Sequence, residues 1–156
     1  HDLGKGSTPK ELLPNHPEHE ARSAELVIEI SKRLPVPKAC RDLGILVAKF
    51  HTHCHRALEL NCESIFKLLE ETDAFRRPER FENLLITCEA DSKGRTGFEK
   101  ISYPQSNFLR GALTAACSID TSYIASQNKK IKISTEIKKA RLNKIKKFKN
   151  EFVLSK

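Results

Sequence analysis

Apolar side chains recur every three or four residues over most of this chain, and prolines separate the stretches in which they do so. That spacing places apolar residues on one face of an α-helix, whereas a half-buried strand needs alternation at every second residue. Such alternation occurs only briefly, near residues 130–133. The pattern therefore predicts an all-α fold, a bundle of helices.

Six helices are expected from this pattern and from the residues that begin and end helices. They are residues 20–34, which Pro35 and Pro37 end; residues 38–59; a third helix capped by Asn61 and reaching about Ala74; a fourth with Pro78 in its first turn; a fifth opened by Pro104; and a last one capped by Ser134 or Thr135. The stripe of the first helix is Ala24, Val27, Ile28 and Leu34. The segment through Pro9, Pro14 and Pro17 reads as a loop.

The basic residues are concentrated at the end of the chain. Residues 1–128 hold 17 Lys and Arg against 18 Asp and Glu, whereas residues 129–156 hold 11 against 2. We therefore expect one domain over 1–128 and a basic C-terminal helix over 129–156 that packs on it. Such a helix either contacts nucleic acid or forms a solvated face. No apolar run approaches the roughly 18 residues that a membrane span requires.

The five cysteines form no C-x-x-C pair, so the sequence suggests neither a zinc ribbon nor a redox dithiol. Free thiols in a reducing cytoplasm are the simpler interpretation, and we expect a cytoplasmic protein. The chain begins at His1 and contains no Met. We therefore expect it to be a piece of a longer protein.

Histidines and carboxylates recur in a pattern that suits a metal ion. His1 precedes Asp2, His19 precedes Glu20, and His51 and His55 share a helix face, from which His53 points away. Imidazole and carboxylate together suit Ni, Zn, Mn, Fe or Mg. An ion held by such groups can polarise a phosphoryl oxygen and activate water. A single His-Asp pair is common, however, and does not by itself establish a metal site.

The order of these groups is more specific. His1-Asp2, His19-Glu20, His51 and Asp91 follow one another as in the HD superfamily of metal-dependent phosphohydrolases, which the chain resembles. Longer strings are similar to the C-terminal HD domain of bacterial multifunctional CCA-adding enzymes. They are HDLGKG at 1–6, RDL at 41–43, DAFRRP at 73–78, EAD at 89–91 and GRTGFE at 94–99. The similarity covers essentially the whole chain.

This resemblance implies an activity. Proteins of the family carry an N-terminal nucleotidyltransferase that restores the CCA end of tRNA. Their HD domain is a 2′,3′-cyclic phosphodiesterase, 2′-nucleotidase and phosphatase that uses nickel or magnesium; manganese or zinc would also suit the donors. The implied partners are tRNA, small nucleotide phosphoesters and the nucleotidyltransferase domain. This chain has no paired carboxylates beside a Gly-Ser loop, so we do not expect it to add nucleotides by itself.

The family's site carries over onto four residues here. His1 and Asp2 match the defining pair, His51 matches the next histidine, and Asp91 is the preferred last carboxylate. We expect all four to bind metal, with His1, Asp2 and His51 catalytic. Thr52 departs from the family, which often has an aspartate there, and the family's histidine upstream of the His-Asp pair is missing. We therefore expect weak metal binding and weak activity in this fragment.

Other residues have both a functional and a structural interpretation. His19 and His55 either support the ligands or bind the ion themselves, although His19 would equally suit a cap. Lys5 and Arg95 are candidate phosphate-binding residues, with ion pairs as the alternative. Candidate contacts to the RNA backbone are Arg76, Arg77, Lys138, Lys139, Lys146 and Lys147. The alternative function is a non-catalytic helical module that packs on the nucleotidyltransferase or guides tRNA.

Overall fold

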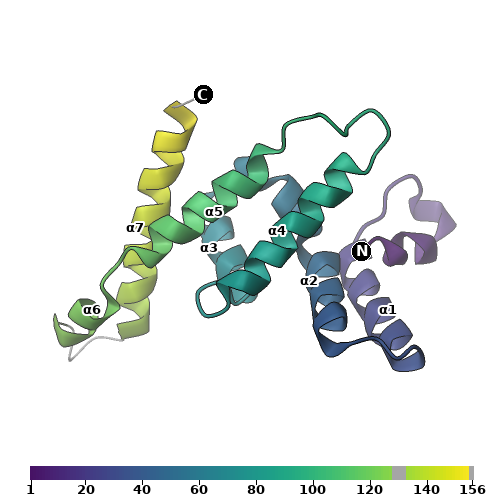
Figure 1. Ribbon diagram of the computed structural model, residues 1–156, viewed down its shortest axis with the longest axis horizontal. Coiled ribbons are helices and arrows are strands. Elements are labelled where there is room, and N and C mark those ends of the chain that lie inside the picture. Colours follow the sequence, from purple (N-terminus) through teal and green to yellow (C-terminus); the bar gives the residue numbers. More distant parts are fainter. Residues whose placement is uncertain (128–132, 155–156) are drawn as a thin grey trace. The chain divides into compact units, whose positions relative to one another are not determined.

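The structure is a computed structural model that describes residues 1–127 and 133–154, and every regular element in those ranges is helical (Figure 1). The α-helices are α1 (His19–Arg33), α2 (Lys38–His55), α3 (Cys62–Glu71), α4 (Pro78–Lys93), α5 (Pro104–Cys117), α6 (Thr121–Gln127) and α7 (Ile133–Leu154). Two short 3-10 helices, η1 (Leu3–Ser7) and η2 (Lys10–Leu12), precede α1, and a third, η3 (Ala57–Glu59), lies between α2 and α3. The predicted all-α class is confirmed.

The residues that begin and end helices act as the sequence predicts. Leu34, the residue before Pro35, has the extended backbone that a following proline favours, and α1 ends there. The Asn61 side chain accepts a hydrogen bond of 2.7 Å from the Ser64 amide and so caps α3. Pro104 occupies the first turn of α5, where its missing N–H is not needed.

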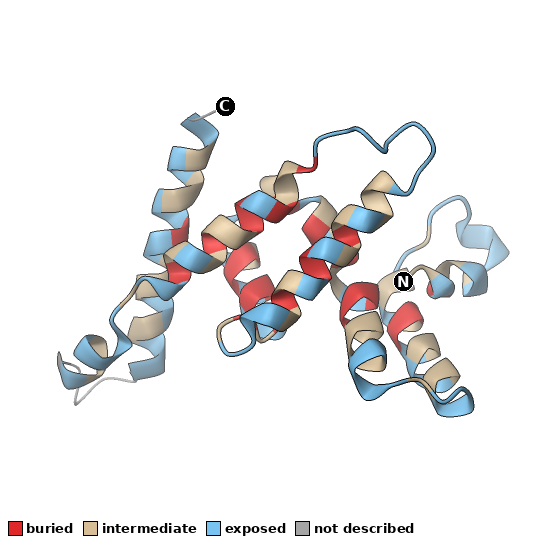
Figure 2. Ribbon diagram, viewed as in Figure 1, coloured by how far each residue is buried: buried red, intermediate tan, exposed pale blue. Residues whose placement is uncertain are grey.

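The chain divides into two compact units, and each is described by itself. The first consists of His1–His55 and Glu82–Ser102. In it α1 packs against α2, and η1 packs against α1. Small and branched residues are buried on these two helices, namely Ala24 on α1 and Leu46, Val47 and Ala48 on α2. Figure 2 shows buried segments of both helices in red. Leu84, Leu85 and Cys88 of α4 are also buried.

The second unit consists of the described residues of Arg56–Phe81 and Tyr103–Lys156. Helix α7 packs against α5, α3 and α6. At the α5–α7 crossing Phe108, Phe148 and Phe152 form an aromatic cluster with ring centroids 5.0–5.7 Å apart. Gly111 lets the ring of Phe148 lie directly on α5, since a Cβ there would collide with it. The predicted division of the chain at residue 128 stays a prediction.

Several expectations about elements need correction. The helix expected over 38–59 ends at His55 and a 3-10 turn follows. Ser134 and Thr135 do not cap the last helix, because it begins at Ile133 and contains both. Ile133, at the edge of the brief strand-like pattern, is helical; residues 130–132 lie outside the described ranges. Ile28 is exposed, because the packed face of α1 is narrower than the apolar stripe expected from the sequence.

Three short elements were not anticipated. The two 3-10 helices η1 and η2 interrupt the segment expected to be a loop, and α6 follows α5 after a short turn. Within the described ranges, no helix combines the length and apolar character needed to cross a membrane.

Candidate metal centre

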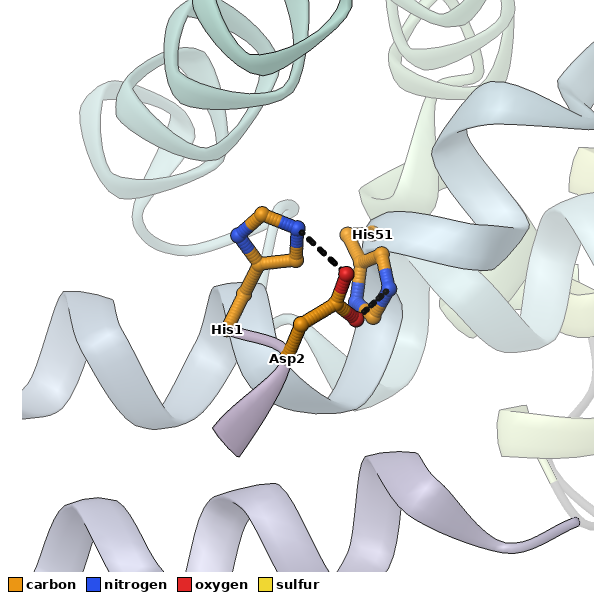
Figure 3. A group of neighbouring side chains, drawn as sticks. All are labelled: His1, Asp2 and His51. Atoms are coloured by element: carbon orange, nitrogen blue, oxygen red, sulfur yellow. Dashed lines mark ion pairs between the residues drawn. The ribbon is translucent and has the colours of Figure 1, made fainter. Parts of the chain in front are cut away.

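Three of the four predicted ligands converge in the first unit (Figure 3). One donor atom from each of His1, Asp2 and His51 lies within 4.8 Å of the other two. Nε2 of His51 is 3.4 Å from Asp2 Oδ1, and Nε2 of His1 is 3.5 Å from Asp2 Oδ2. His51 lies on α2, whereas the other two precede η1, so packing against the α1–α2 pair brings them together.

A close backbone approach holds this N-terminal segment in place. The buried Gly4 amide donates a 2.9 Å hydrogen bond to Ser23 Oγ of α1. A Cβ on Gly4 would lie 2.7 Å from the Ser23 amide nitrogen and would also collide with the His19 carbonyl oxygen. Only glycine lets η1 lie this close to α1, and Asp2 is therefore positioned by the residue two places after it.

Backbone carbonyls determine which imidazole nitrogens face the centre. Nδ1 of His51 lies 3.0 Å from the Val47 carbonyl oxygen, and Nδ1 of His19 lies 2.9 Å from that of His16. A carbonyl oxygen only accepts, so Nδ1 carries the proton and donates it in both rings. In each neutral ring Nε2 is then a lone-pair acceptor, the form in which imidazole binds metal.

The two Nε2 atoms lie close to the same carboxylate oxygen, Oδ1 of Asp2. Nε2 of His19 and Nε2 of His51 each lie 3.4 Å from Asp2 Oδ1. Asp2 Oδ1 and His19 Nε2 are buried and have no hydrogen-bond partner. Acceptor atoms gathered in this way repel one another unless a proton or a cation lies between them. The donor set therefore fits a cation.

Asp91 joins the cluster through two histidines rather than through Asp2. Its Oδ2 forms a 3.0 Å hydrogen bond with His55 Nε2, and its Oδ1 is 3.5 Å from His1 Nε2. The imidazole rings of His51 and His55 have centroids 6.0 Å apart, so the two carboxylates belong to one connected group of side chains. His55 thus holds Asp91, as a residue that supports a ligand would.

The electrostatics keep the carboxylate charged and the buried imidazole neutral. Burial lowers the pKa of His51, and this outweighs the hydrogen bond to Val47 and the charge of Asp2. For Asp2, burial by itself raises the pKa, but the hydrogen bond and charge of Lys5, with the nearby histidines, lower it overall. An ionised Asp2 beside a neutral His51 is the state that metal binding requires.

The candidate phosphate-binding residues are both engaged in ion pairs. Lys5 Nζ is 2.7 Å from Asp2 Oδ2, so it neutralises the carboxylate. Arg95 is mostly exposed, and its guanidinium is 3.8 Å from Asp91 Oδ2. Both cations nonetheless lie at the edge of the cluster.

The candidate RNA-contacting residues all lie in the second unit. Arg76 and Arg77 pair with Asp73 at 2.7 and 3.4 Å. On α7, Lys139 pairs with Glu136 at 2.9 Å and Lys147 with Glu151 at 3.9 Å. Lys146 is exposed, and Lys138 Nζ lies 5.3 Å above the ring of Phe66.

Glu20 and Thr52 contact the cluster more closely than their sequence pattern indicates. Oε2 of Glu20 is 3.4 Å from His19 Nδ1, and its pKa is lowered: burial opposes the shift, but the backbone, the Thr52 hydroxyl, and His19 and His51 outweigh it. The hydroxyl of Thr52 is also 3.3 Å from His51 Nε2. Thr52 thus links Glu20 to the cluster, a role that its own poor ligand chemistry did not indicate.

Comparison with known proteins identifies the relatives of the chain. No protein-family model and no solved structure matches it. It is 44% identical over 152 residues to the multifunctional CCA protein of Hahella chejuensis and 48% identical over 152 residues to that of Alcanivorax borkumensis. It is 41% identical over 155 residues to that of Pseudomonas fluorescens. The chain is homologous to part of the multifunctional CCA proteins.

The extent of the match is asymmetric. The three alignments cover 97–99% of this chain but only 36–38% of the relatives. The chain thus spans little more than a third of the length of the multifunctional CCA proteins that it matches. The resemblance inferred from HDLGKG and the other strings is confirmed.

Proposed function

We propose that this chain is a metal-dependent phosphohydrolase module of the HD type within a multifunctional CCA protein. The observation that carries the proposal is the convergence of His19 Nε2 and His51 Nε2 on Asp2 Oδ1, with no donor hydrogen-bonded to that buried oxygen. A cation would satisfy all three atoms. The proposed substrates are 2′,3′-cyclic phosphodiesters, 2′-nucleotides and other small nucleotide phosphoesters.

The proposed ligands are His1, Asp2 and His51, with Asp91 as a further carboxylate and His19 as a further imidazole. Three imidazoles favour nickel, zinc or manganese over magnesium, which prefers oxygen ligands. When bound, such an ion supplies Lewis-acid activation of water and of a phosphoryl oxygen. This donor set therefore favours nickel among the two metals that the resemblance implies.

The remaining side chains orient the ligands and the substrate. Lys5 fixes the Asp2 carboxylate through its 2.7 Å ion pair, and His55 fixes Asp91 at 3.0 Å. Arg95 is exposed and paired only loosely at 3.8 Å, so its guanidinium is free to turn toward a substrate phosphate and bind it in a bidentate manner. His1, Asp2 and His51 are the proposed catalytic residues.

The proposal extends to the partners. Arg76, Arg77 and the α7 lysines Lys138, Lys139, Lys146 and Lys147 would contact the tRNA backbone, and the nucleotidyltransferase part of the same protein would be the intramolecular partner. Work on tRNA would place the protein in the cytoplasm. The second candidate function is a non-catalytic module that guides tRNA; Thr52, in place of the family's frequent aspartate, favours it.

A pair of variants on one helix separates the two functions. His51→Gln removes a proposed ligand, whereas His53→Gln removes an exposed histidine of α2 two residues away. Each protein is loaded with nickel, dialysed and submitted to elemental analysis, and its hydrolysis of 2′,3′-cyclic AMP is measured. We expect equal nickel contents in the wild type and His53→Gln, low because the fragment binds metal weakly. His51→Gln should lose the bound nickel, and its turnover should be at least roughly 100-fold lower. Equal nickel in all three proteins would instead support the non-catalytic module.

A further inference from the structure

The second unit contains a pocket of about 720 Å³ that the proposed metal chemistry does not use. Its lining comes from α3, α6 and the N-terminal half of α7. Helix α6 packs against α7, as Figure 1 shows. Its polar lining comes from the hydroxyls of Thr121, Ser134 and Thr135 and from the cations Lys138 and Arg141, with Glu70 at α3. Hydroxyl donors beside two cations form the lining expected of an oxyanion site.

Arg141 is held in a fixed orientation but lacks an acceptor. Its guanidinium carbon lies 3.8 Å from the ring centroid of Phe75, so the planar group is held against an aromatic ring. Its Nε is buried and has no hydrogen-bond partner. A buried N–H of a charged group without an acceptor is costly, and an oxyanion in the pocket would supply one.

Lys138 is unneutralised as well. Among the described residues, neither Lys138 nor Arg141 forms an ion pair, although Glu70 lines the same pocket. Three other cations of α7 have partners: Lys139 and Lys147 pair with carboxylates, and Lys149 donates to the Leu60 carbonyl. Lys144 and Lys146 are exposed and do not line the pocket. Two unpaired positive charges of the helix, those of Lys138 and Arg141, thus line the pocket.

The ligand follows from the surroundings of the pocket. Helix α7 carries seven Lys and Arg against two Glu, so the potential around the pocket is positive. The volume exceeds what a single phosphate group fills, and it would admit the neighbouring sugar of a nucleic-acid chain. We propose that this pocket binds a backbone phosphate of RNA, with the guanidinium of Arg141 and the hydroxyl of Ser134 donating to its oxygens. The inference deepens the RNA-binding part of the proposed function and does not depend on the metal site.

A charge inserted at Ser134 tests the pocket without weakening the helix. Ser134 is exposed in the first turn of α7, where an acidic residue interacts favourably with the helix dipole. Ser134→Glu should therefore preserve the unfolding midpoint while it repels phosphate. The control is Asn143→Glu, at an exposed position of the same helix with the same change in net charge.

Binding of each protein to an unmodified tRNA transcript is measured by fluorescence anisotropy at several salt concentrations. We expect Ser134→Glu to weaken binding roughly tenfold or more, since it adds repulsion and removes a donor, and Asn143→Glu to weaken it only about twofold. Arg141→Gln should match Ser134→Glu if it remains folded by circular dichroism. Equal losses in Ser134→Glu and Asn143→Glu would overturn the proposal.

Two further experiments are needed. The first distinguishes RNA phosphate from free phosphate as the ligand, and the second distinguishes failure of this pocket from failure of the metal centre. Inorganic phosphate and AMP are titrated against the wild type and Ser134→Glu. If either ligand binds the wild type tightly while Ser134→Glu keeps its tRNA affinity, the pocket binds a free phosphate, and the RNA proposal is overturned. Nickel content of Ser134→Glu should equal that of the wild type, so a failed metal centre and a failed RNA pocket give different results.

Discussion

Replacing Gly4 with alanine would test whether the approach of η1 to α1 builds the metal centre. Gly4 is not in the left-handed region, so alanine brings no backbone strain and its effect is steric. The new Cβ would lie 2.7 Å from the Ser23 amide nitrogen, whereas ordinary contact begins at 3.4 Å. The N-terminal segment must therefore move away from α1 by at least about 0.7 Å, because the His19 carbonyl oxygen would lie closer still.

That displacement is large for a metal site. Distances from ligand atoms to a bound ion tolerate only about 0.2 Å of change, and Asp2 lies two residues before the displaced glycine. We expect Gly4→Ala to lower the affinity for nickel roughly 10–100-fold, as loss of the groups that orient ligands commonly does. Isothermal titration of the metal-free protein with nickel measures this directly.

The control lies in the same 3-10 helix. A Cβ on Gly6 would meet nothing within 4 Å, so Gly6→Ala makes the same chemical change without the collision. Its nickel affinity should stay within about twofold of that of the wild type. If Gly4→Ala and Gly6→Ala bind nickel equally well, the close approach does not position Asp2, and the reasoning fails.

Two other predictions concern stability. Gly111→Ala should destabilise the second unit by about 1–3 kcal/mol, because the added methyl group overpacks against Phe148. Adding Phe148→Leu should recover part of that loss. A double-mutant cycle measured by urea unfolding would contradict this if it showed no coupling between the two positions. Burial lowers the folded-state pKa of His51, so the unfolded state binds the proton more readily. The free energy of unfolding should therefore fall as the pH drops below about 6.5, the ordinary pKa of histidine. In the metal-free protein, His51→Gln should reduce this pH dependence of the stability, which thermal unfolding between pH 5 and 8 would measure.

The fold was predictable where the residues that begin or end helices agree with the periodicity of the apolar residues. Pro35, Asn61 and Pro104 act through local backbone chemistry, which does not depend on the rest of the chain, and each lies at a helix boundary as expected. The start of α7 was mislocated because Ser and Thr suit a first turn almost as well as a cap. Helix α6 escaped prediction because seven residues are too few to display a periodicity.

For the candidate site, the resemblance supplied the residues but not their geometry, and their role in metal binding stays a prediction. The resemblance supplied His1, Asp2, His51 and Asp91, and the structure brings three of them together in one cluster with Asp91 attached through His1. Spacing carries no information on contacts between distant segments, so it could not place Thr52 beside Glu20. The Asp2–Lys5 ion pair is different, because it joins residues only three apart. The role of Gly4 depends on a tertiary approach that only coordinates reveal.

The partner that orients the His51 ring is a main-chain oxygen one helical turn earlier, at Val47. Every residue type has that oxygen, so substitution at position 47 can change the packing there without removing the acceptor. The proton on Nδ1, and with it the lone pair on Nε2, is therefore protected against most mutations of its neighbour. A comparison of related sequences would find no trace of this partner, since variation at position 47 leaves it intact.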